Sequence, residues 1–397
     1  MTTAGNEHEA LHLPQYGKCH TFDFNVQTAD LLLTVLNYIF INHILCSAFL
    51  PFALFSNCKM NIYIIYPSSA EFWINCDVQK LIGYTSISRH LFKPQESYYT
   101  DSRPSIDTGK ILKYLPCLSE PIYIGCADHD YKSLSKHVIF KRRSFNFDYN
   151  CFVSIRSGND TVFIESPELT FLEAAGSMDL IDLILFGYNL CSARLPANTS
   201  RPSQTNRFSY TSVQLINDFL STAGIYKGIR TARLALRYVL DNSNSEIETR
   251  LGIMSMLPLH LGGYEMSGLL LNHPVELTTD AKRLTNCSII HADLTWPARK
   301  CAIDYNSDEY HLNSKSHSID ANRIAAFQFS GYRLIPATVK DIRRFEDLDI
   351  LMTGIRNMMK FPDKTELLDK YEITRGSLYK RLFKEWTNSR KPSGIPF

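Results

Sequence analysis

Three carboxylates in the last third of the chain have the residue types and spacing of a metal site. Glu248 follows Ser245 by three positions, and Asp293 and Asp304 stand eleven positions apart, with the proline-containing turn 297–300 between them. If the two flanks pair as an antiparallel hairpin, Asp293 and Asp304 face each other with Cβ atoms roughly 4.5–5.5 Å apart. Like charges at that range repel by on the order of 4 kcal/mol at an effective dielectric constant of about 20. Such a pair needs a cation, a shared proton or exposure to solvent.

Alternation along the hairpin separates polar from apolar side chains. One face is expected to carry both acids with four other residues: His291, Asp293, Thr295, Ala302, Asp304 and Asn306. The other face is apolar and suited to packing: Leu294, Trp296, Cys301 and Ile303. Hard cations such as Mg²⁺ bind carboxylate oxygens, and in phosphodiester hydrolysis they activate a water. The pattern therefore predicts that Glu248, Asp293 and Asp304 bind Mg²⁺ or Mn²⁺.

The elements that must position these acids follow from periodicity and turn signals. A helix is expected at 246–257 and strands at 269–272, 288–296 and 300–306, followed by a helix at 319–329 and a strand at 332–336. Helix, three strands, helix, strand (αβββαβ) is the core order of the PD-(D/E)xK nucleases. We therefore expect a restriction-endonuclease-like core over residues 245–345, within a chain that is α+β overall.

Segments 292–297 and 303–311 resemble the branch of these nucleases related to very-short-patch-repair endonucleases. That branch has an Asp followed by an apolar residue, a proline-containing turn, Glu-x-Asp and then a His. The resemblance covers about residues 245–342, and Asp293 and His311 match its pattern outright. It implies a Mg²⁺-dependent endodeoxyribonuclease whose catalytic residues lie at five positions: Glu248, Asp293, Asp304, Asn306 and His311.

Two departures leave activity open. Asp304 stands where the branch has Glu, and Asn306 stands where it has an acid or the signature Lys. The shorter Asp304 retracts the ligand by about one methylene, while a neutral Asn306 can still position water or substrate through its amide. Ser245-x-x-Glu248 is also a capping box, which by itself accounts for Glu248. His311 is either an acid–base group or a surface histidine.

Farther upstream, residues 122–193 resemble, more loosely, the middle domain of type IV abortive-infection antitoxins. Strands are expected at 61–66, 122–125, 136–141 and 161–164. Ser166-Pro167-Glu168 begins a helix, and a buried helix follows at 179–190. The amino-terminal winged helix of that family is not recognisable. We divide the chain into a hydrophobic segment (1–59), an α+β domain (60–196), a linker with helices (197–244), the nuclease-like domain (245–345) and a basic helical tail (346–397).

Residues 31–58 contain no charged side chain and are long enough to cross a bilayer, but Asn37, Asn42 and His43 lie near the middle. A buried segment, or one outside the natural product, is the alternative we favour over a membrane span. The ten cysteines include no Cys-x-x-Cys, so a zinc site is not expected and reduced thiols in the cytoplasm are.

Two groups of basic residues are candidate DNA contacts. Helix 229–240 places three arginines on one stripe close to Lys227: Arg230, Arg233 and Arg237. A helix-turn-helix with its turn at 373–376 would direct four more side chains to phosphate: Arg375, Lys380, Arg381 and Lys384. A solvated helix face and a basic helix packed on the nuclease-like domain are the simpler alternatives. DNA is thus the expected partner, with a protein partner as the alternative for an inactive, antitoxin-like regulator.

Overall fold

The computed structural model describes residues 61–76, 87–90, 108–126, 136–142, 151–157, 160–192, 209–306 and 314–384. All of them belong to one compact unit that begins at Leu54. The predicted segment 1–59, the linker at 197–207 and His311 lie outside these residues. Within them, no helix combines the length and apolarity that crossing a membrane requires. Helices and two mixed sheets confirm the α+β class.

The first sheet forms from the amino-terminal half and has strands of both directions. Its order is β2 (Ile87–His90), β5 (Phe152–Ser157), β6 (Asp160–Glu165), β1 (Asn61–Ile64), β3 (Ile122–Cys126) and β4 (Val138–Arg142). β1 runs parallel to β6 and antiparallel to β3. Two helices precede β3: α2 (Ser68–Asn75) and α4 (Thr108–Tyr114). The strands predicted at 61–66, 122–125, 136–141 and 161–164 are confirmed as β1, β3, β4 and β6.

Four helices follow this sheet: α5 (Pro167–Ala174), α6 (Leu180–Cys191), α7 (Val213–Thr222) and α8 (Ile229–Leu236). Ser166 caps α5 by accepting a hydrogen bond from Leu169 N, with Pro167 in the first turn, as predicted. Asp179 caps α6 in the same way. α7 packs on α5 and α8 packs on α6, so residues 213–236 join the helical layer that covers this part of the core.

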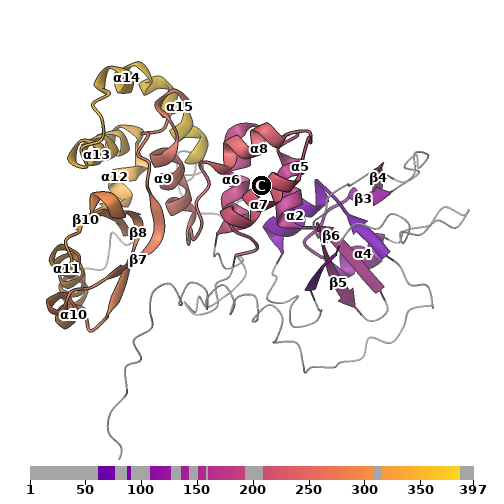
Figure 1. The fold of residues 1–397 in the computed structure, drawn as a ribbon, viewed down its shortest axis with the longest axis horizontal. Coiled ribbons are helices and arrows are strands. Elements are labelled where there is room, and N and C mark those ends of the chain that lie inside the picture. The colour runs from indigo at the N-terminus through magenta and orange to yellow at the C-terminus, as the bar shows by residue number, and fades with distance from the viewer. Residues whose placement is uncertain are drawn as a thin grey trace, which may run out of the picture. The chain divides into compact units, whose positions relative to one another are not determined.

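The second sheet has the predicted αβββαβ order (Figure 1). Its elements are α9 (Glu246–Met256), β7 (Leu270–Glu276), β8 (Ile289–Trp296), β9 (Cys301–Asn306), α11 (Ser314–Phe329) and β10 (Arg333–Thr338). The strands lie in the order β10-β9-β8-β7, antiparallel except for the parallel pair of β9 and β10. A further helix, α10 (Thr279–Thr285), lies between β7 and β8 and was not predicted. Thr278 caps it and Asn286 ends it in a left-handed conformation.

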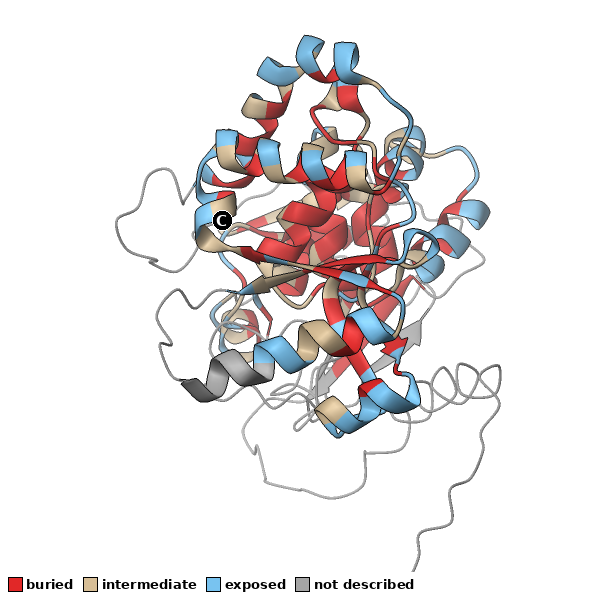
Figure 2. Cartoon of the chain, turned by 90° about the vertical axis from the view of Figure 1, so that its left-hand side faces the viewer, coloured by how far each residue is buried: buried red, intermediate tan, exposed pale blue. Residues whose placement is uncertain are grey.

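Both faces of this sheet are covered, which corrects the expectation of one polar face. Leu294, Trp296, Cys301 and Ile303 join the main core, as predicted. On the other face, however, Ala302 packs with Phe327 of α11 in a second apolar cluster. Figure 2 shows buried residues on the inner sides of the helices and exposed residues on their outer sides. The acids are therefore polar exceptions beside a packed face.

The carboxy-terminal helices are α12 (Val339–Arg343), α13 (Phe345–Met358), α14 (Thr365–Lys370) and α15 (Glu372–Leu382). The turn predicted at 373–376 is wrong, because α15 continues through it and the break falls at Tyr371. Arg375 N donates to Tyr371 O (2.9 Å), and Arg375 itself is anchored inside the protein. The helix-turn-helix interpretation is therefore replaced by its alternative, a helix packed against η2 (Leu259–Leu261), α9 and α13.

Candidate functional site

Glu248 lies in the first turn of α9 and is 6% exposed. Ser245 Oγ accepts a hydrogen bond from Glu248 N (3.2 Å), which confirms the predicted cap. The Glu248 carboxylate does two further things. Its Oε2 accepts from Asn244 N (2.8 Å) and from Asn272 Nδ2 of β7 (2.5 Å). Glu248 therefore ends the helix and also points to the sheet, so its two predicted roles coexist.

Asp293 lies on β8 at the level where β9 leaves the regular ladder. The pairing of Leu294 with Ile303, continued by one residue, brings Asp293 to the level of Asp304. Tyr305 N donates to Asp293 Oδ2 (2.7 Å). Burial raises the pKa of Asp293 to about 7, helped by the charges of Glu248 and Asp304, while the hydrogen bond from Tyr305 N and Arg323 oppose the rise. The three acids are thus close enough to act on one another.

Asp304 of β9 is bound by Arg323 of α11. Arg323 Nε donates to Asp304 Oδ2 (2.7 Å), and Nη2 donates to Oδ1 (3.1 Å). The same Nη2 also donates to the backbone oxygen of His291. Arg323 was expected to pair with Asp320 along the helix, but it reaches across to the sheet instead. The resulting bidentate pair is a strong, oriented interaction.

A sequence signal for Arg323 existed. It precedes Ala326 and Phe327 by three and four positions, so all three share one face of α11. Ala326 and Phe327 are buried in the second apolar cluster, and the Arg323 guanidinium lies 5.5 Å from the centre of the Phe327 ring. An arginine on the buried face of a helix needs an acid or carbonyl partner there. Asp304 and His291 O provide it.

Other predicted and neighbouring residues stand around this group. Asn306 is exposed at the end of β9, opposite Thr338 of β10. His291 Nδ1 lies 2.9 Å from Asn272 O, next to the acids. Burial, aided by His291, lowers the pKa of His273 on β7. The two histidines on neighbouring strands were not predicted as site residues, because only the register of β7 and β8 brings them together.

The acids have the donor chemistry of a Mg²⁺ site but are held by protein donors. Carboxylate oxygens are the ligands that this cation prefers. Within the part of the chain that the structure describes, however, no three His, Cys, Asp or Glu side chains are grouped to hold a metal ion. Arg323 occupies both oxygens of Asp304, while Asn244 and Asn272 bind Glu248. Joint coordination by Glu248, Asp293 and Asp304 therefore requires Arg323 to release Asp304.

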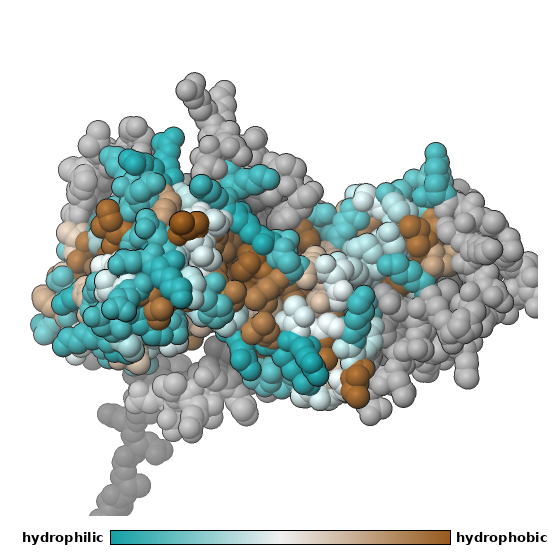
Figure 3. All heavy atoms as spheres, turned by 90° about the horizontal axis from the view of Figure 1, so that it is seen from above, coloured by the Kyte–Doolittle hydropathy of each residue, from teal (hydrophilic) through white to brown (hydrophobic). Residues whose placement is uncertain are grey.

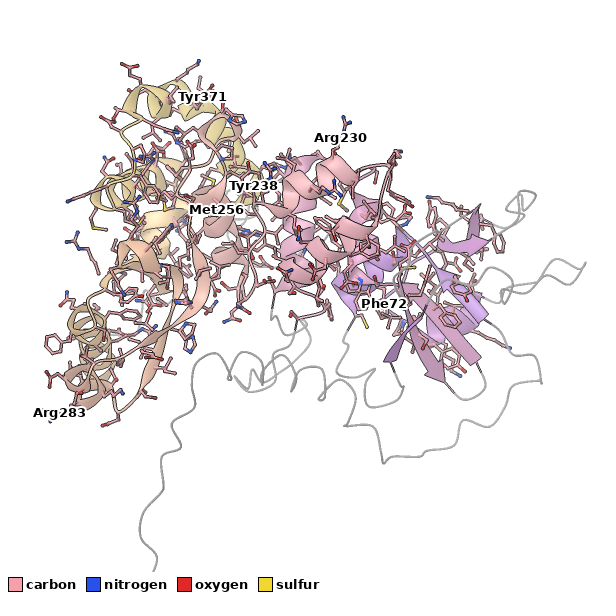
Figure 4. The ribbon with its side chains drawn as sticks, in the orientation of Figure 1. Phe72, Arg230, Tyr238, Met256, Arg283 and Tyr371 are labelled. Atoms are coloured by element: carbon pink, nitrogen blue, oxygen red, sulfur yellow. The ribbon has the colours of Figure 1, made fainter. Side chains whose placement is uncertain are left out.

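The predicted basic stripe on α8 faces solvent. Arg230, Arg233 and Arg237 are exposed, as is Lys227 before the helix. Arg233 Nη2 also donates to Leu220 O (2.9 Å), which fixes that side chain to α7. Arg230 points away from the helices in Figure 4. Figure 3, viewed from the side that carries α8 at the top of Figure 1, shows hydrophilic residues over much of that side.

The second basic group is corrected in part. Arg375 is 2% exposed and is bound to Asp349, so it does not face solvent. Arg381 Nη2 pairs with Asp179 (2.6 Å) and Asp182 (2.5 Å), the cap and first turn of α6. Lys380 and Lys384 are exposed. Two of the four side chains predicted to contact phosphate are thus committed to carboxylates of the chain itself.

We expect Arg381→Gln to lower the free energy of unfolding by about 0.5–1 kcal/mol, since an exposed ion pair contributes modestly. Urea denaturation at low salt measures the difference, which should shrink at high salt because exposed charges are screened. Lys380→Gln, at the exposed neighbouring position on α15, is the matched control and should change stability little. An equal loss in both variants would mean that the pair with Asp179 and Asp182 does not stabilise the protein.

Neither models of known protein families, nor curated proteins, nor solved structures match this chain. Arguments about its function therefore depend on its own residues and their geometry.

Proposed function

We propose that the chain hydrolyses DNA phosphodiester bonds with the aid of Mg²⁺ or Mn²⁺, using the acids beside β8 and β9. The observation that carries the proposal is the pKa of Asp293, raised to about 7 by burial and by Glu248 and Asp304. A structural role gives no reason to gather three carboxylates from a helix and two strands, since the ionised forms repel. Perturbed carboxylates of this kind are typical of functional sites.

Glu248, Asp293 and Asp304 would hold the cation. A divalent cation in such a site lowers the pKa of a water molecule and neutralises charge that develops on the phosphate. The chain's own residues supply the positioning. Tyr305 N orients Asp293, and Asn272 orients Glu248 from β7. Arg323 and the cation compete for Asp304 because both bind its carboxylate oxygens.

Plasmid cleavage tests the proposal. The purified full chain is expected to nick supercoiled DNA in Mg²⁺ or Mn²⁺ and to be inactive in excess chelator. Asp293→Ala and Asp304→Ala should each lose the activity, whereas Glu276→Ala, an exposed acid on the neighbouring strand β7, should keep it. Cleavage that persists in both aspartate variants would mean that the activity comes from another site or from a contaminant.

One observation favours a second candidate, a nuclease fold that binds DNA or a protein partner without cutting. Arg323 neutralises Asp304 in place of a cation, and Asn306 adds no charge. Such a protein would act as a regulator, in keeping with the antitoxin resemblance of residues 122–193. DNA binding without cleavage under any divalent metal supports this candidate and contradicts the first.

We expect Arg230→Gln and Arg237→Gln to weaken DNA binding, because both side chains are exposed on the α8 stripe. Each phosphate contact that is lost should reduce the slope of log K against log salt by about 0.9. Fluorescence anisotropy with a short duplex at several salt concentrations measures both effects. Arg283→Gln is the control, since Arg283 is an exposed arginine on α10 that pairs with Asp280 (Figure 4). An unchanged slope in the α8 variants would leave the stripe as a solvated helix face.

A further inference from the structure

Two cysteines that are 41 positions apart in the sequence meet in the amino-terminal half. Cys76 is the residue that ends α2, and Cys117 lies in the loop between α4 and β3. Their side chains are hydrogen-bonded to each other. The contact was not visible in the sequence, where the nearest cysteine pair is Cys117 and Cys126.

The backbone around both thiols is anchored. Cys76 N donates to Phe72 O (2.9 Å), and Cys76 O accepts from Tyr210 Oη (2.9 Å). On the other side, Ser119 N donates to Glu71 Oε2 (2.9 Å), which ties the Cys117 loop to α2. The two sulfur atoms are therefore neighbours by construction of the fold.

The two thiols differ in exposure and in acidity. Cys117 is partly exposed, whereas Cys76 is buried. The hydrogen bond from the Cys76 thiol lowers the pKa of Cys117, against burial and the charge of Glu71, which raise it. The thiolate is the reactive form of cysteine, so reagents in solution should meet Cys117 first. Cys76, covered behind it, is placed to react second.

We propose that Cys76 and Cys117 form a dithiol site that a hydroperoxide converts into a disulfide. The Cys117 thiolate attacks one peroxide oxygen, the O–O bond breaks, and Cys117 becomes a sulfenic acid while the peroxide is reduced to water or an alcohol. The Cys76 sulfur then attacks the Cys117 sulfur, the S–O bond breaks, and the Cys76 proton leaves with the hydroxyl as water. The product joins the end of α2 to the loop before β3. This inference does not depend on the proposed nuclease function.

Other cysteines lack this combination. Burial raises the pKa of Cys301 to about 11 and raises that of Cys191 well above its ordinary value, so both stay protonated. Cys287 is exposed at the end of α10 and serves as an internal comparison. A reagent limited only by access should modify Cys287 at least as fast as Cys117. A reagent that follows the proposed route should convert the Cys76–Cys117 pair first.

The test uses the reduced full chain, treated with near-stoichiometric hydrogen peroxide, alkylated and digested without reductant. Mass spectrometry should find a Cys76–Cys117 cross-linked peptide, and the ten thiols of the chain should fall by two. Reductant should restore them. Cys287→Ser should give the same cross-link. In Cys76→Ser, Cys117 should instead accumulate as a sulfenic acid that dimedone traps.

Two results would overturn the proposal, and the first needs only the wild-type chain. One is a peroxide-treated wild type in which Cys76 and Cys117 are alkylated as fully as before treatment. The other is a cross-link map in which Cys117 pairs with several cysteines to similar extents, since a fixed neighbour should yield one product. Circular dichroism of the serine variant confirms that a missing cross-link does not reflect unfolding.

Discussion

A chain carrying Asp293→Asn is expected to lose metal-dependent DNA cleavage and, at pH 8, to be more stable than the wild type. Asn keeps an oxygen that can accept the hydrogen bond from Tyr305 N but carries no charge toward Glu248 and Asp304. Cleavage should fall by about 10²–10³-fold or more, the cost of removing one electrostatic stabiliser. Stability should rise because an ionised, partly buried acid beside two others is relieved.

The pH dependence has a defined sign. The pKa of Asp293 is about 7 in the folded chain, above its ordinary value of 3.8. Between those values the folded chain holds a proton that the unfolded chain releases, so the free energy of unfolding falls as pH rises. The contribution is complete below about pH 4 and is lost as pH passes through about 7. The ionisation penalty that Asp293→Asn removes should be about 2–4 kcal/mol at pH 8 and small at pH 4.

Chemical denaturation at pH 4, 6 and 8 measures this difference, with Glu276→Gln as the exposed-acid control on β7. Mn²⁺ supplies a second measurement, independent of cleavage. At a hundred times its Kd it should stabilise the wild type by about 2.7 kcal/mol and should have much less effect on Asp293→Asn. A variant that is less stable than the wild type at pH 8 would mean that the fold needs the ionised form of Asp293.

Replacing Arg375 with Leu is expected to lower the free energy of unfolding by about 3–5 kcal/mol, because it removes one partner of a buried ion pair. Arg375 Nε donates to Asp349 Oδ1 (2.8 Å), and Nη1 donates to Leu368 O (2.6 Å). Tyr264 Oη donates to the same Asp349 oxygen (2.8 Å). The network joins α13, α15 and the segment after α9. Without Arg375, Asp349 keeps its charge in a largely covered position.

Urea denaturation of Arg375→Leu tests this result against Lys380→Leu, an exposed position on the same helix. The double variant Arg375→Leu/Asp349→Asn should recover part of the loss, since it removes the carboxylate that is left without its partner. DNA affinity separates the structural role from the phosphate contact predicted for Arg375. A fully stable Arg375→Leu that binds DNA more weakly would restore the phosphate contact.

The element order of the second sheet was predictable because each of its signals is local. Ser245 and Glu248 announce the start of α9, and Pro297 marks the turn between β8 and β9. The missed helix α10 also had signals: Thr278 as cap, Asp280 in its first turn and Asn286 at its end. It was overlooked because a strand was expected to continue into the hairpin. The false turn at 373–376 arose from giving Gly376 too much weight as a helix breaker, although it packs beside Phe345.

The sequence by itself determined where helices and strands begin, which hairpin residues enter the main core and that Glu248, Asp293 and Asp304 belong to one candidate site. Caps, turns and alternation involve residues within a few positions of each other, so the chain displays them directly. Only the tertiary structure decided that Arg323 binds Asp304, that Arg375 is buried against Asp349 and that Cys76 meets Cys117. Those contacts join separate elements, and the free energy of placing a charge or a thiol depends on what packing brings beside it.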